Sequence, residues 1–321
     1  MCGVTEERVH RTAYSVEVAA PAAVVYGLVS EAVQWPLFFP SNVHVERLEF
    51  DGTNERLRMW ATAGGRIRSW ISTRVQDPQT RRVEFRQQHV QPPVRTMDGT
   101  WAVEELPGEA CLLTLRHAFT VHGDRAEDVA WVERALAVNS RAQLDSLRSL
   151  AQRWARFDSL VLTFEDSLRI DAPAEPVYEF LHRAADWPGV LPHVSRLELT
   201  EDTPGVQVMT MDTRTQDGAV HTTESVRVCF PHAGRIVYKQ TATPELIEAH
   251  SGEWNVVSDA HGVTAVAQHS VVLREDAVRR VLGPDAGLAH ARRHVRQTLR
   301  RDTTALLHRA RTHAESAPGT R

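Results

Sequence analysis

The sequence lacks the features by which metal, redox, phosphate-binding and membrane proteins are usually recognised. Its 321 residues contain three cysteines, Cys2, Cys111 and Cys229, which lie far apart in no metal-like spacing. No glycine-rich phosphate loop is present, and no apolar run approaches the length of a membrane span. We therefore expect a cytoplasmic protein that uses no metal and no cofactor and that does not associate with a membrane.

Lysine is almost absent too, because Lys239 is the only lysine among the 37 basic residues. The formal net charge is −4, which argues against a general nucleic-acid-binding protein, so we expect no nucleic-acid partner. The chain is 42% hydrophobic and 24% charged, a balance typical of globular domains, and its length fits one large or two ordinary domains.

What the sequence does contain is an internal repeat, in which matching motifs recur 152 or 153 residues apart. The matched pairs are Ala20–Tyr26 with Ala172–Tyr178, Trp35-Pro36 with Trp187-Pro188, Arg82–Phe85 with Arg235–Tyr238, Gly99-x-Trp101 with Gly252-x-Trp254, and His117 with His269. A spacing that stays constant to within one residue over so long a stretch indicates a duplicated domain. We predict two domains, at residues 1–156 and 157–321.

The first repeat shows a legible order of elements. Residues 14–18 alternate like a strand, and Pro21 begins a helix that we expect Trp35-Pro36 to end. Alternating segments separated by turn signals such as Asp51-Gly52 then indicate an antiparallel meander. A long helix over about 126–154 closes the unit, with an apolar stripe at helical spacing.

The second repeat ends in the same way, with a helix over about 288–313 that follows a linker at 276–287. The apolar stripe of each long helix is interrupted by a polar pair, Asn139-Ser140 in the first repeat and Asp302-Thr303 in the second. The predicted fold class is therefore α+β. It consists of two tandem helix-grip domains, each a curved antiparallel sheet wrapped around a long C-terminal helix with room for a ligand cavity between them.

One strand carries the most informative side chains. In Trp70-Ile71-Ser72-Thr73-Arg74, alternation points the indole, the hydroxyl and the guanidinium to the same face. If that face lines an interior, the arginine requires a partner, which is either another residue or a ligand. The alternative is an exterior face with Arg74 in water. The serine and arginine recur as Ser225 and Arg227, whereas Trp70 becomes Thr223.

These motifs resemble those of di-domain aromatase/cyclases of bacterial type II polyketide synthesis, within the START-like (polyketide cyclase) superfamily. The motifs that carry the resemblance are the Pro-initiated helix with Trp35-Pro36, Trp70-x-Ser72-x-Arg74 with Asp77-Pro78, Phe85-Arg86-Gln87, Gly99-x-Trp101 and Asn139-Ser140. The resemblance implies aldol cyclisation, dehydration and aromatisation of the first ring of a carrier-bound, ketoreduced poly-β-ketone chain. It implies an acyl carrier protein, the polyketide chain and other synthase subunits as partners.

The resemblance also implies roles for individual residues. Carried over to this sequence, the catalytic residues are Ser72, Arg74, Ser225 and Arg227. The substrate-binding residues are Trp35, Trp70, Arg86, Gln87, Met97, Trp101, His117, Asn139, Trp187, Gln240, Trp254 and His269. Because the second repeat lacks the indole of Trp70, we expect its pocket to be wider. The first pocket would then fold the chain and close the ring, and the second would assist dehydration or hold the product. Alternatively, the second half is a scaffold.

One rival function and two further motifs have alternative interpretations. A non-catalytic START-like carrier of a hydrophobic small molecule fits the same fold, but it would gain little from two buried guanidinium groups. His290 and His294 have the i, i+4 spacing of a metal pair, yet no acidic third ligand is evident. The arginine-rich segment 292–301 is either a solvated helix face or a surface that attracts an acidic carrier protein.

Overall fold

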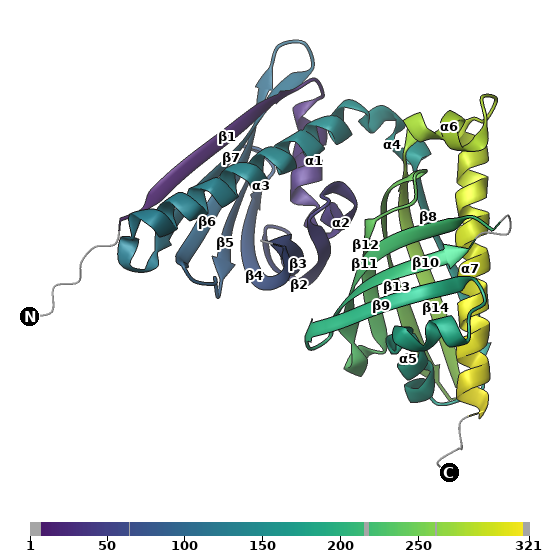
Figure 1. Cartoon of the computed structure of the whole chain (residues 1–321). Helices are drawn as coiled ribbons and strands as arrows, with labels where there is room; N and C mark the ends of the chain where they lie inside the picture. Colours follow the sequence, from purple (N-terminus) through teal and green to yellow (C-terminus); the bar gives the residue numbers. More distant parts are fainter. Residues whose placement is uncertain (1–7, 64, 215–217, 261, 317–321) are drawn as a thin grey trace, which may run out of the picture. The chain divides into compact units, whose positions relative to one another are not determined.

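A computed structural model describes residues 8–63, 65–214, 218–260 and 262–316, so Cys2 lies outside the described residues. The chain divides into two compact units, Met1–Phe157 and Asp158–Arg321. Each unit contains one seven-stranded antiparallel sheet and a long C-terminal helix (Figure 1), which confirms the predicted α+β fold of tandem helix-grip domains. Within the described ranges, no helix is both long and apolar enough to cross a membrane.

The first unit forms its sheet in the order β1-β7-β6-β5-β4-β3-β2, with long helix α3 packed against β1, β7 and α1. Its elements are β1 (His10–Val18), α1 (Ala22–Ser30), α2 (Trp35–Phe38), β2 (Asn42–Phe50), β3 (Asn54–Ala63), β4 (Arg66–Asp77), β5 (Arg82–Gln88), β6 (Val94–Leu106), β7 (Ala110–Val121), α3 (Ala126–Gln152) and α4 (Trp154–Leu160), which runs across the boundary between the units.

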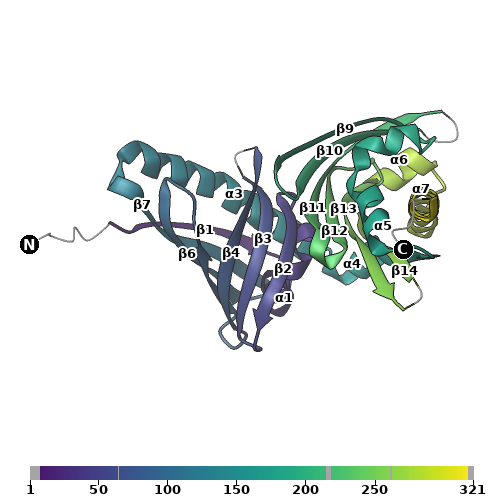
Figure 2. The same ribbon diagram turned by 90° about the horizontal axis from the view of Figure 1, so that it is seen from below.

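The second unit repeats this topology in the order β8-β14-β13-β12-β11-β10-β9, and its sheet curves around α5, α6 and α7 (Figure 2). Its elements are β8 (Val161–Ile170), α5 (Ala174–His182), β9 (Val194–Thr203), β10 (Val206–Arg214), β11 (Val220–Phe230), β12 (Arg235–Ala242), β13 (Ile247–Asp259), β14 (Gly262–Leu273), α6 (Val278–Leu282) and α7 (Leu288–Ser316). Helix α7 packs against β8, β14 and α5.

Two local predictions differ from the structure. Helix α1 ends at Ser30, and Trp35-Pro36 begins the separate helix α2 rather than ending the first one. Proline is tolerated in the first turn of a helix, where its missing N–H has no intrahelical partner in any case. The segment 276–287, predicted to be a linker, contains the short helix α6.

The core of the second unit is divided into two apolar clusters, and α7 contributes to both. One cluster contains Val295 and the other contains Leu306, and between them along the helix lies Thr303, which is also buried. Ser140 is buried on α3 in the same way. A buried polar side chain within the apolar stripe of a helix requires a hydrogen-bond partner. We therefore expect partners for Thr303 in the space between the two apolar clusters.

Candidate active site

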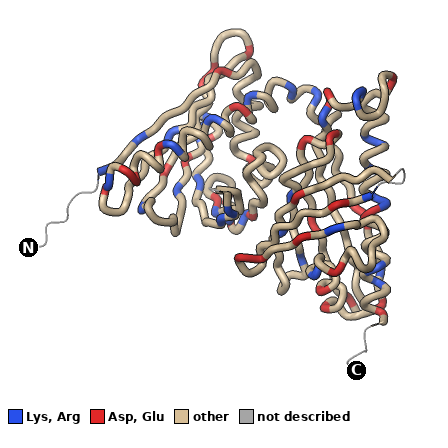
Figure 3. The backbone as a smooth tube through the Cα atoms, viewed as in Figure 1, with Lys and Arg blue, Asp and Glu red and all other residues tan. Residues whose placement is uncertain are grey.

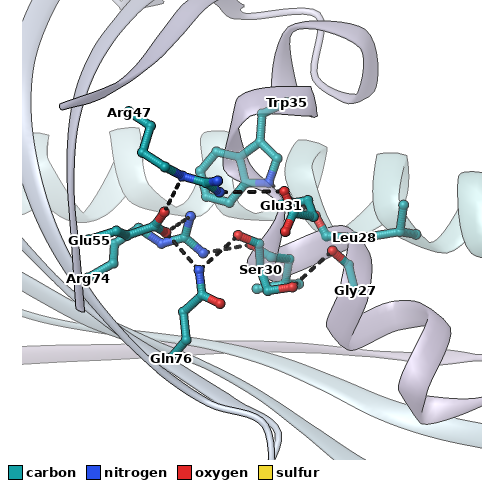
Figure 4. A network of polar contacts seen from close by, with 10 residues as sticks. Gly27, Leu28, Ser30, Glu31, Trp35, Arg47, Glu55, Arg74 and Gln76 are labelled. Atoms are coloured by element: carbon teal, nitrogen blue, oxygen red, sulfur yellow. Dashed lines mark hydrogen bonds and ion pairs between the residues drawn. The ribbon is translucent and has the colours of Figure 1, made fainter. Parts of the chain in front are cut away.

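Ser72 and Arg74 lie on the inner face of β4 in the first unit, with only 3% and 2% of their surfaces exposed. The Arg74 guanidinium donates a 2.7 Å hydrogen bond from Nη2 to the carbonyl oxygen of Val29 at the end of α1. It also lies 5.0 Å from the ring centroid of Trp35 (Figure 4). Arg74 therefore joins the end of α1 and the Trp35 ring to the sheet.

A buried carboxylate offsets the charge of this arginine. Glu55 Oε1 lies 2.9 Å from Arg74 Nη1, and the Glu55 side chain is fully buried. Gln76 donates a 2.9 Å hydrogen bond to Glu55, and Arg47 donates a second at 3.1 Å (Figure 4). Burial lowers the pKa of Arg74 to about 10, and the nearby Glu55 carboxylate opposes that shift.

The equivalent arginine of the second unit, Arg227, has no such carboxylate. Its Nη1 donates a 2.7 Å hydrogen bond to Oε1 of Gln207, the residue that stands at the place of Glu55. Its Nη2 donates to the carbonyl oxygen of Leu181 at the end of α5, and its guanidinium lies 5.4 Å from the Trp187 ring centroid. Among the described residues, no carboxylate lies within ion-pair distance of Arg227, and its positive charge is not directly neutralised.

A cavity of about 710 Å³ lies within the second unit, between the inner face of its sheet and the helices α6 and α7. That volume is in the range of ordinary small-molecule sites. The polar residues that line the cavity include Ser225, Arg227, Tyr238, Gln240, His250, His269 and Thr303. Most of the exposed surface of the cavity is apolar, but more than half of its lining residues are polar or charged, among them also Arg214, Glu245, Arg301 and Asp302.

Three of these side chains meet at one point. Tyr238 Oη lies 2.8 Å from His269 Nδ1 and 3.3 Å from His250 Nε2, and the two histidine nitrogens lie 3.1 Å apart. Gln240 Oε1 lies 3.0 Å from His250 Nδ1, and Thr303 Oγ1 lies 3.0 Å from His269 Nε2. We call these five side chains the tyrosine–histidine cluster.

Burial sets the protonation of this cluster at neutral pH. It lowers the pKa of His250 to about 3 and that of His269 to about 4, and it raises the pKa of Tyr238 well above its usual value. Both imidazoles are therefore neutral, and the phenol keeps its proton. The cluster offers the cavity a hydroxyl donor and imidazole nitrogens that can accept a proton.

A glycine makes this meeting possible. Tyr238 and His269 are separated by one strand, and Gly252 is the residue between them in both strand registers. A Cβ atom at Gly252 would lie 2.5 Å from Tyr238 Oη and 2.3 Å from the carbonyl oxygen of Gln268. The phenol thus reaches across β13 to His269 only because that position has no side chain.

The first unit has the same strand arrangement, but other residues occupy the positions of the tyrosine–histidine cluster. Phe85 lies over Gly99 in the same way and contacts the His117 ring edge to face at 6.0 Å. Burial lowers the pKa of His117 to about 4, and its Nδ1 has no hydrogen-bond partner among the described residues. Met97 occupies the place of His250 and packs in an apolar cluster with Phe119.

The structure gathers most of the residues that the sequence singled out, but not all. In the second unit Trp187, Ser225, Arg227, Gln240, Trp254 and His269 all line the cavity. In the first unit Trp35 and Trp101 lie 6.3 Å apart, edge to face. Trp70 and Gln87 are half-buried, and the Trp70 Nε1 is buried with no hydrogen-bond partner among the described residues.

Two of the expected substrate-binding residues lie elsewhere. Arg86 is on the outward face of β5, where it pairs with Asp98 at 2.5 Å, because alternation opposes it to Gln87. Asn139 is exposed on α3, and its neighbour Ser140 takes the buried place. Neither side chain faces the interior of the first unit, so the structure gives no support to the substrate-binding role that the resemblance implied for Arg86 and Asn139.

Sequence reasoning missed Tyr238, His250 and Thr303 as site residues. The repeat spacing of 153 pairs Met97 with His250 and Phe85 with Tyr238, so two polar replacements at inward positions were visible in the sequence. Their meeting was not visible, because it depends on strand registers and on the gap between the apolar clusters.

The remaining candidates have structural contacts of their own. Arg292 donates 2.7 Å hydrogen bonds to the carbonyl oxygens of Ser159 and Val161, and Arg296 pairs with Asp166 at 2.6 Å. These contacts join α7 to the end of α4 and to β8. Acidic and basic residues are interspersed along the whole described chain (Figure 3). Within the described ranges, no group of three or more potential ligands is placed to hold a metal ion.

Comparison with known proteins gives consistent results. The model of the family "Polyketide cyclase / dehydrase and lipid transport" matches residues 9–152 and 161–315. The granaticin polyketide synthase bifunctional cyclase/dehydratase of Streptomyces violaceoruber is 40% identical over 96% of this chain and 95% of its own. The corresponding actinorhodin protein of Streptomyces coelicolor is 39% identical over 97% of each chain.

Two solved structures are similar over nearly the full length. The di-domain ARO/CYC BexL from the BE-7585A biosynthetic pathway has a TM-score of 0.88 and 45% identity, covering 96% of this chain and all of its own. The di-domain ARO/CYC StfQ from the steffimycin pathway has a TM-score of 0.82 and 31% identity, covering 95% of this chain and 98% of its own.

Proposed function

The chain belongs to the polyketide cyclase/dehydrase family, and from this membership we propose that it forms the first aromatic ring on a polyketide chain. The reaction is aldol cyclisation followed by dehydration, on a ketoreduced poly-β-ketone bound to an acyl carrier protein of a type II synthase. The relatives support this proposal, because two polyketide synthase cyclase/dehydratases match over at least 95% of their own length.

The observation that carries the proposal is the second-unit cavity, in which an arginine and the tyrosine–histidine cluster face the same space. Aldol closure requires that a proton leaves an activated methylene and that negative charge on the acceptor carbonyl is stabilised. Arg227 suits the second task, because its charge is fixed, its fork is rigid and no carboxylate neutralises it directly. Ser225, two residues earlier on β11, supplies a hydroxyl to the same carbonyl region.

The apolar walls supply the remaining part of the catalysis. A poly-β-ketone is flexible, and holding two of its carbons in one reactive geometry removes much of the entropic barrier. Trp187 and Trp254 are rigid aromatic walls in the second unit, as Trp35 and Trp101 are in the first.

The first unit carries an equivalent serine–arginine pair, so we propose that it can also take part in ring closure, the step that the sequence assigned to the first pocket alone. Ser72 and Arg74 are the candidates for ring closure there, and Trp70 shapes the chain. Because Glu55 offsets the charge of Arg74, the electrostatic contribution of Arg74 to an oxyanion is smaller than that of Arg227.

A carrier of hydrophobic molecules would share this fold, and the family description includes lipid transport. Burying two imidazoles, a phenol and a guanidinium beside an apolar ligand costs free energy that a carrier does not recover. The polar cluster therefore favours the enzyme over the carrier.

The test is reconstitution with a minimal type II synthase and its carrier protein, followed by identification of the products. Adding the full chain should replace spontaneous shunt products with one first-ring aromatic product. Unchanged products would refute the proposal.

Paired variants then show which of the two units catalyses ring formation. Arg227→Met should remove the aromatic product, and the loss caused by Arg74→Met shows what the first unit contributes. Arg86→Met, on the outward face of β5, is the matched control and should leave the products unchanged. If Arg227→Met is folded and still gives the normal product, Arg227 does not stabilise the oxyanion.

A further inference from the structure

The two units share their Ser–Arg pair but differ at two inward positions. Tyr238 and His250 of the second unit stand where the first unit has Phe85 and Met97. The shared pair serves a step that both pockets could perform, whereas a step that requires a phenol and a second imidazole is possible only in the second. We infer that Tyr238 and His250 are the catalytic acid and base for the elimination of water, an inference that rests on the proposed function.

The hydrogen-bond pattern shows how the cluster presents both groups. If His250 Nδ1–H donates to Gln240 Oε1, then His250 Nε2 is left without a proton and is free to act as a base. His269 Nδ1–H then donates to Tyr238 Oη across 2.8 Å, and Thr303 Oγ–H donates to His269 Nε2. The phenol O–H then has His250 Nε2 as its acceptor within the cluster at 3.3 Å, and a substrate hydroxyl that enters the cavity can replace this acceptor.

This arrangement places a donor and an acceptor 3.3 Å apart, side by side, at the wall of the cavity. A β-hydroxy ketone carries its acidic hydrogen and its hydroxyl on neighbouring carbons. One face of such a substrate can therefore contact His250 Nε2 and Tyr238 Oη together.

The step balances without any further reactant. His250 Nε2 takes the proton beside the carbonyl, the carbon–carbon double bond forms, and the carbon–oxygen bond breaks. The Tyr238 proton passes to the departing hydroxide, which leaves as water. The proton on His250 then returns to the Tyr238 oxygen, either directly or through His269, and the cluster is restored.

Burial sets the starting protonation of both groups, although it also makes the phenol a weaker acid and the imidazole a weaker base. It keeps Tyr238 protonated and His250 neutral, and the charges that develop during the reaction are opposite and adjacent, so they stabilise each other. Gln240 is a positioning residue, because its contact with Nδ1 decides which nitrogen of His250 is bare.

The first unit supplies substitutions that this fold already accommodates. Tyr238→Phe and His250→Met reproduce the residues that occupy the same places over the equivalent Gly99. Each variant of the full chain is added to the reconstituted synthase, and quenched time points are analysed by mass for the aromatic product and for the cyclised product that retains one more water.

We expect each variant to slow dehydration about 100-fold or more, in line with the usual contribution of general acid–base catalysis, while ring closure continues. The hydrated, cyclised product should accumulate. His232→Met, an exposed histidine of the same unit, is the control and should behave as the wild type.

Two outcomes would overturn the inference. One is a normal rate of aromatic product from either folded variant. The other is loss of ring closure together with dehydration, which would make the cluster part of the cyclisation site. Failure of the wild type itself to change the products would instead refute the proposed function, so the two failures are distinguishable.

Discussion

The buried ion pair of the first unit gives a sharp test of how the fold is held together. Glu55→Gln keeps the shape of the side chain and removes its charge, which leaves Arg74 as a buried cation 2% exposed to solvent. Breaking one partner of a buried pair costs roughly 3–5 kcal/mol. The amide oxygen still presents a partial negative charge to Arg74, so we take the lower end, about 3 kcal/mol.

The second unit indicates why that cost is not smaller. There Gln207 stands beside Arg227 naturally, but Gln207 also donates a 2.9 Å hydrogen bond to Glu201, so a carboxylate lies one step away. The residue at the place of Glu201 in the first unit is Glu49, which pairs with Arg56 at the surface. Glu55→Gln therefore leaves Arg74 with the weaker influence of Glu31, a more exposed carboxylate that pairs with Arg47 at 3.5 Å.

Calorimetry of the full chain measures this effect. For a unit of this size, about 3 kcal/mol corresponds to a fall of roughly 6–12 °C in the melting temperature of the first unit. Hydrogen exchange should also rise across residues 22–38, where Arg74 holds the end of α1. Glu49→Gln is the control, because an exposed pair contributes at most about 1 kcal/mol. Equal shifts for the two variants would refute the role assigned to the Glu55–Arg74 pair.

Two further predictions concern the buried histidines and a glycine. Because burial lowers the pKa of His117 and His269 to about 4 and that of His250 to about 3, the unfolded chain binds more protons than the folded one between about pH 6.5 and 4. The free energy of unfolding should be greatest above about pH 7. Between about pH 6.5 and 4 it should fall by up to about 1.4 kcal/mol per pH unit for each histidine. Urea titrations at several pH values should show a shallower fall for His250→Met, and a flat profile would contradict the assignment. Gly252→Ala should destabilise the second unit by about 1–3 kcal/mol, because the new methyl group would lie 2.3 Å from a backbone oxygen that cannot move. Gly189→Ala, which has nothing within 4 Å, should cost little, and equal costs would show that the strand crossing is not tight.

Much of the fold could be predicted from the sequence because both periodicities were strong and were repeated. The long helices begin at Ala126 and Leu288 as predicted and end within three residues of the predicted positions. The alternation around Ser72 also placed Ser72 and Arg74 on one face, and the structure shows that this face is the inner one. The same rule, applied to Phe85-Arg86-Gln87, would have excluded Arg86 from the cavity.

The partners of the buried arginines could not be predicted. Arg74 meets Glu55 because the two residues are opposite each other in the β3–β4 register, and it meets Val29, 45 residues away in sequence, because the end of α1 reaches the inner face of β4. The tyrosine–histidine cluster required the registers of three strands and the place of Thr303 on α7 at once. Comparison of the two repeats shows the individual replacements that form the cluster, but it does not show that these residues contact one another.

Counting turnovers tests most directly whether the chain is an enzyme acting on a carrier-bound polyketide or a carrier of one. The full chain is supplied at a fiftyfold deficit to polyketide-loaded carrier protein, and first-ring aromatic product is measured over time. An enzyme forms many equivalents of this product per molecule of protein, and the Tyr238→Phe variant forms the hydrated, cyclised compound in its place. Product that stops at one equivalent or fewer, with the rest of the chain going to spontaneous products, would contradict the account.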